Sequence, residues 1–469
     1  MLFNSTVYVV FLCLIAGIYW RLNFRSQNRF LLAASYFFYG WWDWRFLLLM
    51  IFSTVVDYLI AHRIARASSG SERKRWLIIS LVLNFSILGV FKYCNFFVGS
   101  FSHLLRAAGI TGAPDEFLKI LLPPGISFYT FQEVAYIVDV YHRKLEPAQS
   151  FLDYALFISL FPHLIAGPIQ RPSHLLPQVQ QPRVWNPEKA FDGMLLILEG
   201  YFRKCVIADN CALLADAAFN GRLGPPNLAV LLLGTYAFAW QIYGDFSGYS
   251  NIARGSAQLL GFHFMVNFRQ PYLAESLQKF WRRWHISLSS WLRDYLYIPL
   301  GGSRGGEAKT YRNLMTTMLL GGLWHGANWT FVLWGGLHGG GLAAERMLAR
   351  EETPARRSTA AVWVRRIQIF HLVCLAWVFF RAPSVGDAFA MLRGAAVWQW
   401  RPEYLVALEF LVVFSIPLFF LDLMLENTGD EYVFQSRPAV RRVAWGVAAF
   451  CAVMLFGANR ANAFIYFQF

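Results

Sequence analysis

Residues 30–60 read FLLAASYFFYGWWDWRFLLLMIFSTVVDYLI, and this stretch decides the fold class. It is apolar and aromatic almost throughout, but it is longer than the about 20 residues that one helix needs to cross a bilayer. Gly40-Trp41-Trp42-Asp43 interrupts it with a turn-forming glycine and with rings suited to a membrane–water interface. The stretch therefore predicts two membrane helices joined by an aromatic turn.

The composition extends this prediction to the whole chain. Of 469 residues, 57% are hydrophobic and only 15% are charged, against roughly 25% charged in a typical soluble domain. Lipid must therefore be part of the solvent, and the segments predict an all-α polytopic membrane protein with roughly 10–13 transmembrane and re-entrant helices. Further long apolar segments are residues 2–20, 76–105, 151–165, 191–208, 227–243, 314–348, 362–380, 404–425 and 443–456.

Two segments are poor spanning helices. Residues 121–132 (LLPPGISFYTFQ) carry a double proline, and residues 161–172 (FPHLIAGPIQRP) are interrupted in a similar way. Irregular backbone at membrane depth is tolerated only when it is buried in protein or lines a cavity. Both segments predict re-entrant elements and a hollow interior. The sequence shows no internal repeat, which counts against an inverted-repeat transporter.

The net charge of +14 arises from basic residues that fall between apolar runs. This placement favours cytoplasmic loops beside anionic headgroups over a nucleic-acid-binding module, so no nucleic-acid partner is expected. The basic loops after the first and third predicted helices indicate an N-terminus outside the cytoplasm. Their basic residues are Arg21, Arg25, Arg29, Arg63, Arg66, Arg73, Lys74 and Arg75.

The most conspicuous polar residue is His325, in the apolar stretch GGLWHGANWT at residues 321–330. Ionisable groups inside a membrane are functional candidates, and a neutral imidazole could take a proton from a hydroxyl. A histidine that is hydrogen-bonded between helices is the alternative, which the spacing alone slightly favours. A continuous helix would place Asn328 and Trp329 on the face of His325. For His338, in a second glycine-rich stretch, packing is the expected role.

Residues 280–295 (FWRRWHISLSSWLRDY) have helical spacing with two faces. One face is polar and the other is aromatic. The arginines of the polar face could hold a phosphate-bearing acyl donor, or they could anchor the helix to anionic lipid. The aromatic face would comprise Trp281, Trp284, Leu288, Trp291 and Tyr295, and the polar face Arg282, His285, Ser289 and Arg293.

A third polar stretch is residues 241–255 (QIYGDFSGYSNIARG), which includes Asp245 and Tyr249. Buried polar groups persist only when they are satisfied, so the stretch lines water or a substrate path, or forms a structural cluster. The chain lacks the P-loop, dinucleotide, HExxH and GxSxG motifs. No metal and no tightly bound cofactor are expected.

The block FWRRWHISL at residues 280–288, followed by Leu323-Trp-His-Gly, resembles the membrane-bound O-acyltransferase family. The bacterial branch of alginate O-acetyltransferases and teichoic acid D-alanyl transferases is the most similar, and the alginate type is favoured within it. Supporting blocks lie at residues 160–169, 243–250, 291–302 and 464–469. At Asn251 this chain departs from the aspartate expected from the family.

The resemblance implies a ring of helices around a central tunnel, built as a single transmembrane domain over residues 1–469. Within it, N-terminal helices would occupy residues 1–110, the catalytic core residues 111–350 and C-terminal helices residues 351–469. By the same resemblance, His325 corresponds to the active-site histidine, and His285 to a second, more variable one.

The activity implied is O-acetyl transfer from a cytoplasmic thioester, with acetyl-CoA as co-substrate, across the bacterial inner membrane. His325 would act as general base towards a hydroxyl arriving from the periplasmic side. A periplasmic partner protein would complete the transfer to an exopolysaccharide. The expected substrate-binding residues are Arg282, Arg283 and Arg293 at the phosphates, with Asn328, Tyr249 and Asp245 nearer the reacting groups.

Two alternatives remain at this point. The first keeps the enzyme class and changes the acceptor to peptidoglycan, cellulose or another envelope molecule. The second is a transporter or flippase for acyl groups or lipids, to which re-entrant segments and intramembrane histidines would also be suited.

Overall fold

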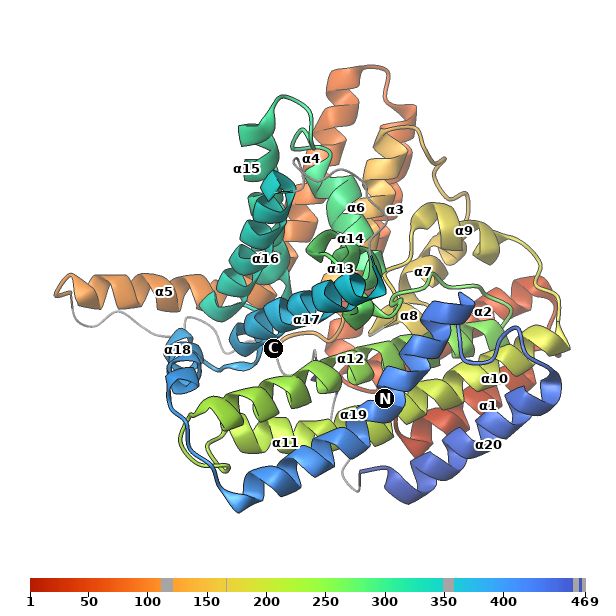
Figure 1. The fold of residues 1–469 in the computed structure, drawn as a ribbon. Helices are drawn as coiled ribbons and strands as arrows, with labels where there is room; N and C mark the ends of the chain where they lie inside the picture. The colour runs from red at the N-terminus through yellow and green to blue at the C-terminus, as the bar shows by residue number, and fades with distance from the viewer. Residues whose placement is uncertain (111–120, 166, 349–357, 459–463, 466–469) are drawn as a thin grey trace. The chain divides into compact units, whose positions relative to one another are not determined.

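The computed structural model describes residues 1–110, 121–165, 167–348, 358–458 and 464–465 (Figure 1). These residues form helices, turns and irregular segments, and no strand occurs among them. Five described helices are long and apolar enough to cross a membrane. The predicted all-α polytopic class is therefore confirmed. The five are residues 44–66, 70–107, 359–381, 402–428 and 439–456.

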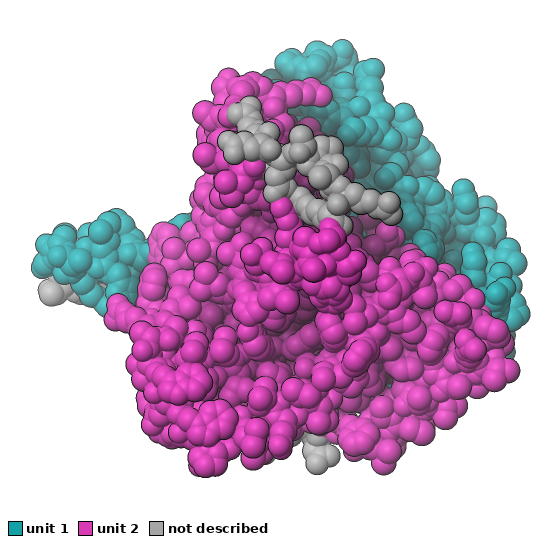
Figure 2. Space-filling view, viewed as in Figure 1, with its two compact units in different colours: residues 1, 5–190, 256–264 teal, residues 2–4, 191–255, 265–469 magenta. Residues whose placement is uncertain are grey.

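The chain divides into two compact units, coloured separately in Figure 2. Unit 1 comprises residues 1, 5–190 and 256–264, and unit 2 comprises residues 2–4, 191–255 and 265–469. The predicted central tunnel and the predicted division of the chain at residues 110 and 350 stay predictions.

In unit 1, the interruption predicted at residues 40–43 is confirmed. Helix α2 (Phe24–Gly40) ends at Gly40, and α3 (Trp44–Arg66) begins four residues later. Asp43 caps α3 by accepting a hydrogen bond from the Arg45 backbone N–H at 2.9 Å. The other helices of unit 1 are α1 (Thr6–Tyr19), α4 (Gly70–Leu88), η1 (Gly89–Tyr93), α5 (Cys94–Ala107), α6 (Ile126–Tyr141), α7 (Phe151–Ser159), α8 (Phe161–Leu164) and α9 (Pro172–Gln180).

The two irregular segments of unit 1 lie against each other. Gly125 adopts φ +74° just before α6, and a Cβ there would come 2.6 Å from the Leu164 carbonyl oxygen. Gln132 and His163 also approach each other, with Nε2 and Nδ1 3.3 Å apart. Both side chains are buried. The turn at Gly125 is thus packed against protein, as the membrane argument requires, whereas Leu121 and Leu122 are exposed. Re-entry itself stays a prediction.

Unit 2 begins with α10 (Pro187–Tyr201), most of which belongs to it, and α12 (Leu228–Leu259) extends through it to residue 255. These helices approach closely, because Cβ atoms at Gly200 and Gly248 would each lie 2.7 Å from the other's carbonyl oxygen. The remaining elements are η2 (Phe202–Ala208), α11 (Asp209–Phe219), η3 (Pro271–Leu273), α13 (Leu277–Arg283), α14 (Ile286–Leu292), η4 (Arg293–Tyr297), α15 (Glu307–His325), α16 (Trp329–Leu348), α17 (Thr359–Arg381), α18 (Val385–Arg393), η6 (Gly394–Ala396), α19 (Pro402–Thr428) and α20 (Ala439–Phe456).

Helices α15 and α16 run side by side in unit 2 and pack through glycines (Figure 1). A Cβ on Gly335 would lie 3.0 Å from the Met318 carbonyl carbon, and a Cβ on Gly322 would lie 3.1 Å from that of Phe331. Small residues let two helix backbones approach in this way, which is a common packing mode in membranes. Gly340, on the same helix as Gly335, faces open space.

Gly335→Ala should therefore destabilise the protein by about 1–3 kcal/mol, because the added methyl group forces the two backbones apart. The matched change Gly340→Ala should leave stability equal or higher, because alanine favours a helix over glycine by roughly 1 kcal/mol. Thermal unfolding of both variants in detergent measures the difference. Equal unfolding temperatures for the two variants would contradict the close packing.

Candidate active site

His325 is the last residue of α15 and is only 3% exposed. Its ring meets Trp334 at 4.9 Å between centroids with the planes at 87°, and Phe380 of α17 at 5.3 Å. Trp324 completes the enclosure at 5.1 Å. Aromatic rings from three helices thus hold the imidazole in an apolar enclosure, where a neutral base has few competing waters.

The predicted second histidine lies beside the first. The centroids of His285 and His325 are 6.5 Å apart, and His285 is fully buried. Nδ1 of His285 is 3.2 Å from Oδ1 of Asn267. An amide oxygen can only accept, so Nδ1 carries the proton in this arrangement and Nε2 is the acceptor nitrogen of the neutral ring.

The backbone at His285 corrects the predicted continuous helix over residues 280–295. Helix α13 ends at Arg283, His285 adopts the left-handed conformation with φ +42°, and α14 starts at Ile286. Asn267 replaces the missing helical bonds, since its carbonyl accepts from Ile286 N–H and its Oδ1 from Ser287 N–H. A buried non-glycine residue with positive φ is uncommon and is typical of functional sites.

A second correction concerns Asn328. A helix does not continue from His325 to Trp329, because α15 ends at His325 and α16 starts at Trp329. Oδ1 of Asn328 accepts from the Thr330 backbone N–H at 3.1 Å, and its amide donates to the Pro383 carbonyl at 3.1 Å. Asn328 caps the new helix, which is a common position for asparagine. Trp329 is 54% exposed.

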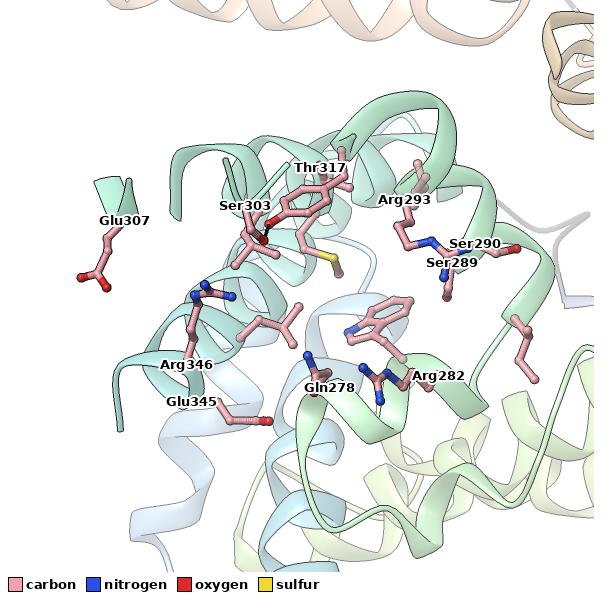
Figure 3. A pocket seen from close by; sticks show the side chains of 17 residues that line it. Gln278, Arg282, Ser289, Ser290, Arg293, Ser303, Glu307, Thr317, Glu345 and Arg346 are labelled. Carbon is pink, nitrogen blue, oxygen red and sulfur yellow. Dashed lines mark hydrogen bonds between the residues drawn. The ribbon is translucent and has the colours of Figure 1, made fainter. Parts of the chain in front are cut away.

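A cavity of about 640 Å³ lies between α13, α14, α15 and α16 (Figure 3). Arg282 and Arg293 lie towards one side of it and Arg346 towards the other. The side-chain hydrogen bond to Asp294 raises the pKa of Arg293, so this guanidinium stays charged. The other lining residues are Gln278, Trp281, Ile286, Ser289, Ser290, Leu292, Tyr297, Ser303, Glu307, Leu314, Thr317, Met318, Leu342 and Glu345.

Neither His285 nor His325 lines this cavity. Aromatic rings lie between the cavity and His325. Trp281 lines the cavity and contacts Trp334 at 5.7 Å between ring centroids, and Trp334 in turn contacts His325. The predicted phosphate-binding residue Arg283 also does not line it. It donates to both carboxylate oxygens of Glu426, at 2.8 and 3.0 Å.

Asp245 and Tyr249 belong to a buried polar network on α12. Lys204 bridges Asp209 and Asp245, at 2.8 and 2.6 Å. Asp245 also accepts from the Ile465 backbone N–H at 2.7 Å. The Tyr249 hydroxyl donates to Asn4 at 2.9 Å. These contacts are those expected of a structural cluster. The alternative from the sequence, that the stretch lines a substrate path, stays a prediction.

A neighbouring network surrounds Arg203, which pairs with Glu199 at 2.9 Å and with Asp422 at 3.6 Å. Tyr243 donates to Asp422 at 2.8 Å. At Asn251, where the family resemblance led us to expect aspartate, the amide donates to Glu199 at 3.2 Å. An aspartate there would place a second carboxylate beside Glu199.

Asp245→Asn should therefore lower stability rather than weaken substrate binding. Removing one partner of a buried ion pair costs about 3–5 kcal/mol, because the other charge remains buried. Thermal unfolding should shift down strongly, while the KM for the acyl donor of the folded fraction stays unchanged. Asp387→Asn, at an exposed aspartate in the first turn of α18 in the same unit, is the control. A normal unfolding temperature with a raised KM would show instead that Asp245 binds substrate.

Sequence reasoning missed three residues of this region. Asn267 holds the turn at His285, and its only signal was an amide within the apolar run at residues 264–268. Trp334 contacts His325 from the next helix, and Arg346 reaches the cavity from the end of α16. Their roles depend on which helices pack together, which spacing within one segment does not reveal.

Two neighbouring buried histidines in an aromatic enclosure, inside a polytopic helical protein, form the candidate site. The model of the membrane-bound O-acyltransferase family matches residues 143–380, a range that contains both histidines and the cavity. The chain belongs to this family, and it is an acyltransferase.

Curated relatives are similar over most of the chain. A protein named "Probable alginate O-acetylase AlgI" from Pseudomonas aeruginosa is 45% identical over 404 residues, which is 85% of this chain and 76% of the relative. A peptidoglycan O-acetyltransferase from Helicobacter pylori is 36% identical over 84% of this chain and 79% of its own length. A teichoic acid D-alanyltransferase from Streptococcus thermophilus is 29% identical over 46% of this chain and 55% of its own length.

Proposed function

We propose that this protein is an O-acetyltransferase that moves acetyl groups across the bacterial inner membrane onto the hydroxyls of an alginate-like exopolysaccharide. The observation that carries the proposal is the enclosed His325–His285 pair, in a chain 45% identical to an alginate O-acetylase. A transporter or flippase would not require a buried base of this kind.

His325 is the general base. It takes the proton of an acceptor hydroxyl as the oxygen attacks the acetyl carbonyl carbon, and it returns a proton to the departing thiolate. The reaction needs positioning, one base and a site that excludes water. The rings of Trp324, Trp334 and Phe380 supply that exclusion. His285, which is hydrogen-bonded to Asn267, helps to orient the His325–His285 pair.

The donor is acetyl-CoA, and its phosphates bind in the arginine-lined cavity. Arg282 and Arg293 match the residues expected from the sequence, and Arg346 adds a third cation. A guanidinium is well suited to phosphate because it presents several fixed donors. Two carboxylates, those of Glu307 and Glu345, also line the cavity, and Oε2 of Glu345 accepts from the Leu277 backbone N–H at 2.6 Å. The donor enters the cavity from the cytoplasmic side, as the family resemblance implies.

The acceptor reaches His325 from the periplasmic side. A periplasmic partner protein accepts the acetyl group on a hydroxyl and passes it to the polysaccharide. Peptidoglycan is the second candidate acceptor, since the chain is 36% identical to a peptidoglycan O-acetyltransferase. Mass spectrometry of cell-envelope glycans from cells with and without the protein separates the two acceptors.

His325→Ala should reduce acetyl transfer from labelled acetyl-CoA by about 10²–10⁴-fold, because the hydroxyl loses its base. The unfolding temperature in detergent should change little. His103→Ala, an exposed histidine of α5, is the control and should keep full activity. A folded His325→Ala protein that transfers acetyl at the wild-type rate would refute the mechanism.

Arg346→Gln and Arg282→Gln should each raise the KM for acetyl-CoA by roughly 5–10-fold with little change in kcat, because each removes one partly solvated phosphate contact. The effect should shrink as ionic strength rises. Arg304→Gln, an exposed residue that does not line the cavity, should leave the KM unchanged. Identical KM values for all three variants would place the donor elsewhere.

A further inference from the structure

Trp334 occupies a central position in the site, where the proposed mechanism uses its ring but not its indole N–H. Its side chain has no solvent exposure, and its ring contacts both His325 and His338, at 4.9 and 4.8 Å between centroids. It also stacks on Trp377 at 5.9 Å, with the planes at 20°. The close packing of Gly335 on α15 leaves this part of α16 little freedom to move.

The indole N–H of Trp334 is buried and has no acceptor within the described part of the chain. Buried tryptophan N–H groups are normally hydrogen-bonded, so an orphaned one calls for an explanation. Two other buried groups on α16, the Thr330 hydroxyl and Nε2 of His338, likewise lack partners among the described residues. The three residues are spaced four apart, so they share one face of the helix.

We propose that the Trp334 indole N–H binds the substrate, by donating a hydrogen bond to the carbonyl oxygen of the acyl thioester beside His325. The proposal rests on the proposed acetyl transfer and adds a catalytic residue to it. Thr330, Trp334 and His338 form a stripe of polar groups along α16. Trp334 contacts His325, and His338 contacts Trp281, which lines the arginine cavity. The stripe therefore lies between the proposed phosphate site of the donor and the base.

The step balances with these groups alone. The acceptor oxygen forms a bond to the acyl carbon while its proton moves to His325, and negative charge develops on the former carbonyl oxygen. Trp334 stabilises that charge with its N–H. The carbon–sulfur bond then breaks, the carbonyl re-forms, and the thiolate takes the proton from His325. A donor that strengthens its bond as charge develops accelerates the chemical step more than it aids binding.

The test replaces Trp334 by phenylalanine, or by the isosteric 3-benzothienylalanine, which keeps the ring shape and removes the N–H. Both variants should lower kcat by about 100-fold, with little change in the KM for acetyl-CoA. The matched control is Trp445→Phe. The Trp445 indole nitrogen is also buried without a partner among the described residues, but its ring contacts Phe202 and Phe434 instead.

A second donor separates hydrogen bonding from packing. In the dithioester of CoA, sulfur replaces the carbonyl oxygen and accepts hydrogen bonds poorly. With this donor, the Trp334 variants should differ from wild type by only roughly threefold, because the N–H then contributes little. A wild-type kcat in the Trp334 variants, or an equal loss with both donors, overturns the proposal while the acetyltransferase function stands. A wild-type protein that transfers no acetyl overturns both.

Discussion

The close approach of α15 and α16 is the constraint on which the site depends. Glycines on both helices bring the backbones together, with Gly322 against Phe331 and Gly335 against Met318. This packing places the end of α15, with its histidine, against the first turns of α16, with Trp334. Lipid supplies no hydrophobic force between helices, so this contact relies on van der Waals fit, and a single methyl group at the crossing disturbs it.

Buried charges in unit 2 provide a second rigid element. Arg203 and Lys204 lie on η2 with almost no exposure, yet each is matched by carboxylates from α10, α11, α12 or α19. Charges at membrane depth are tolerated only when they are paired in this way. The network joins helices that are far apart in the sequence. It also bonds to the chain near its C-terminal end, where the Ile465 backbone N–H donates to Asp245. Its polar residues bond to one another, whereas the proposed chemistry belongs to the histidine enclosure.

The sequence predicted the helical membrane class and the break at residues 40–43, because these depend on local hydrophobicity. It also singled out His325 as one ionisable group in an apolar run, and the structure buries that residue, while its catalytic role stays a prediction. It did not predict the breaks at His285 and after His325. There, Asn267 and Asn328 replace helical hydrogen bonds with side-chain bonds, and such long-range contacts leave no periodic signal. The contact of Trp334 with His325 was missed for the same reason, since it arises only when α16 packs on α15.

The central claim is that the acyl group is transferred at His325. A cryo-electron microscopy structure with an unreactive acetyl-CoA analogue, in which a methylene replaces the thioester sulfur, tests it most directly. The account predicts the nucleotide phosphates at Arg282, Arg293 and Arg346, and the acetyl carbonyl between His325 and Trp334. An acetyl group lodged outside the aromatic enclosure, with these rings still closed around His325, would contradict it.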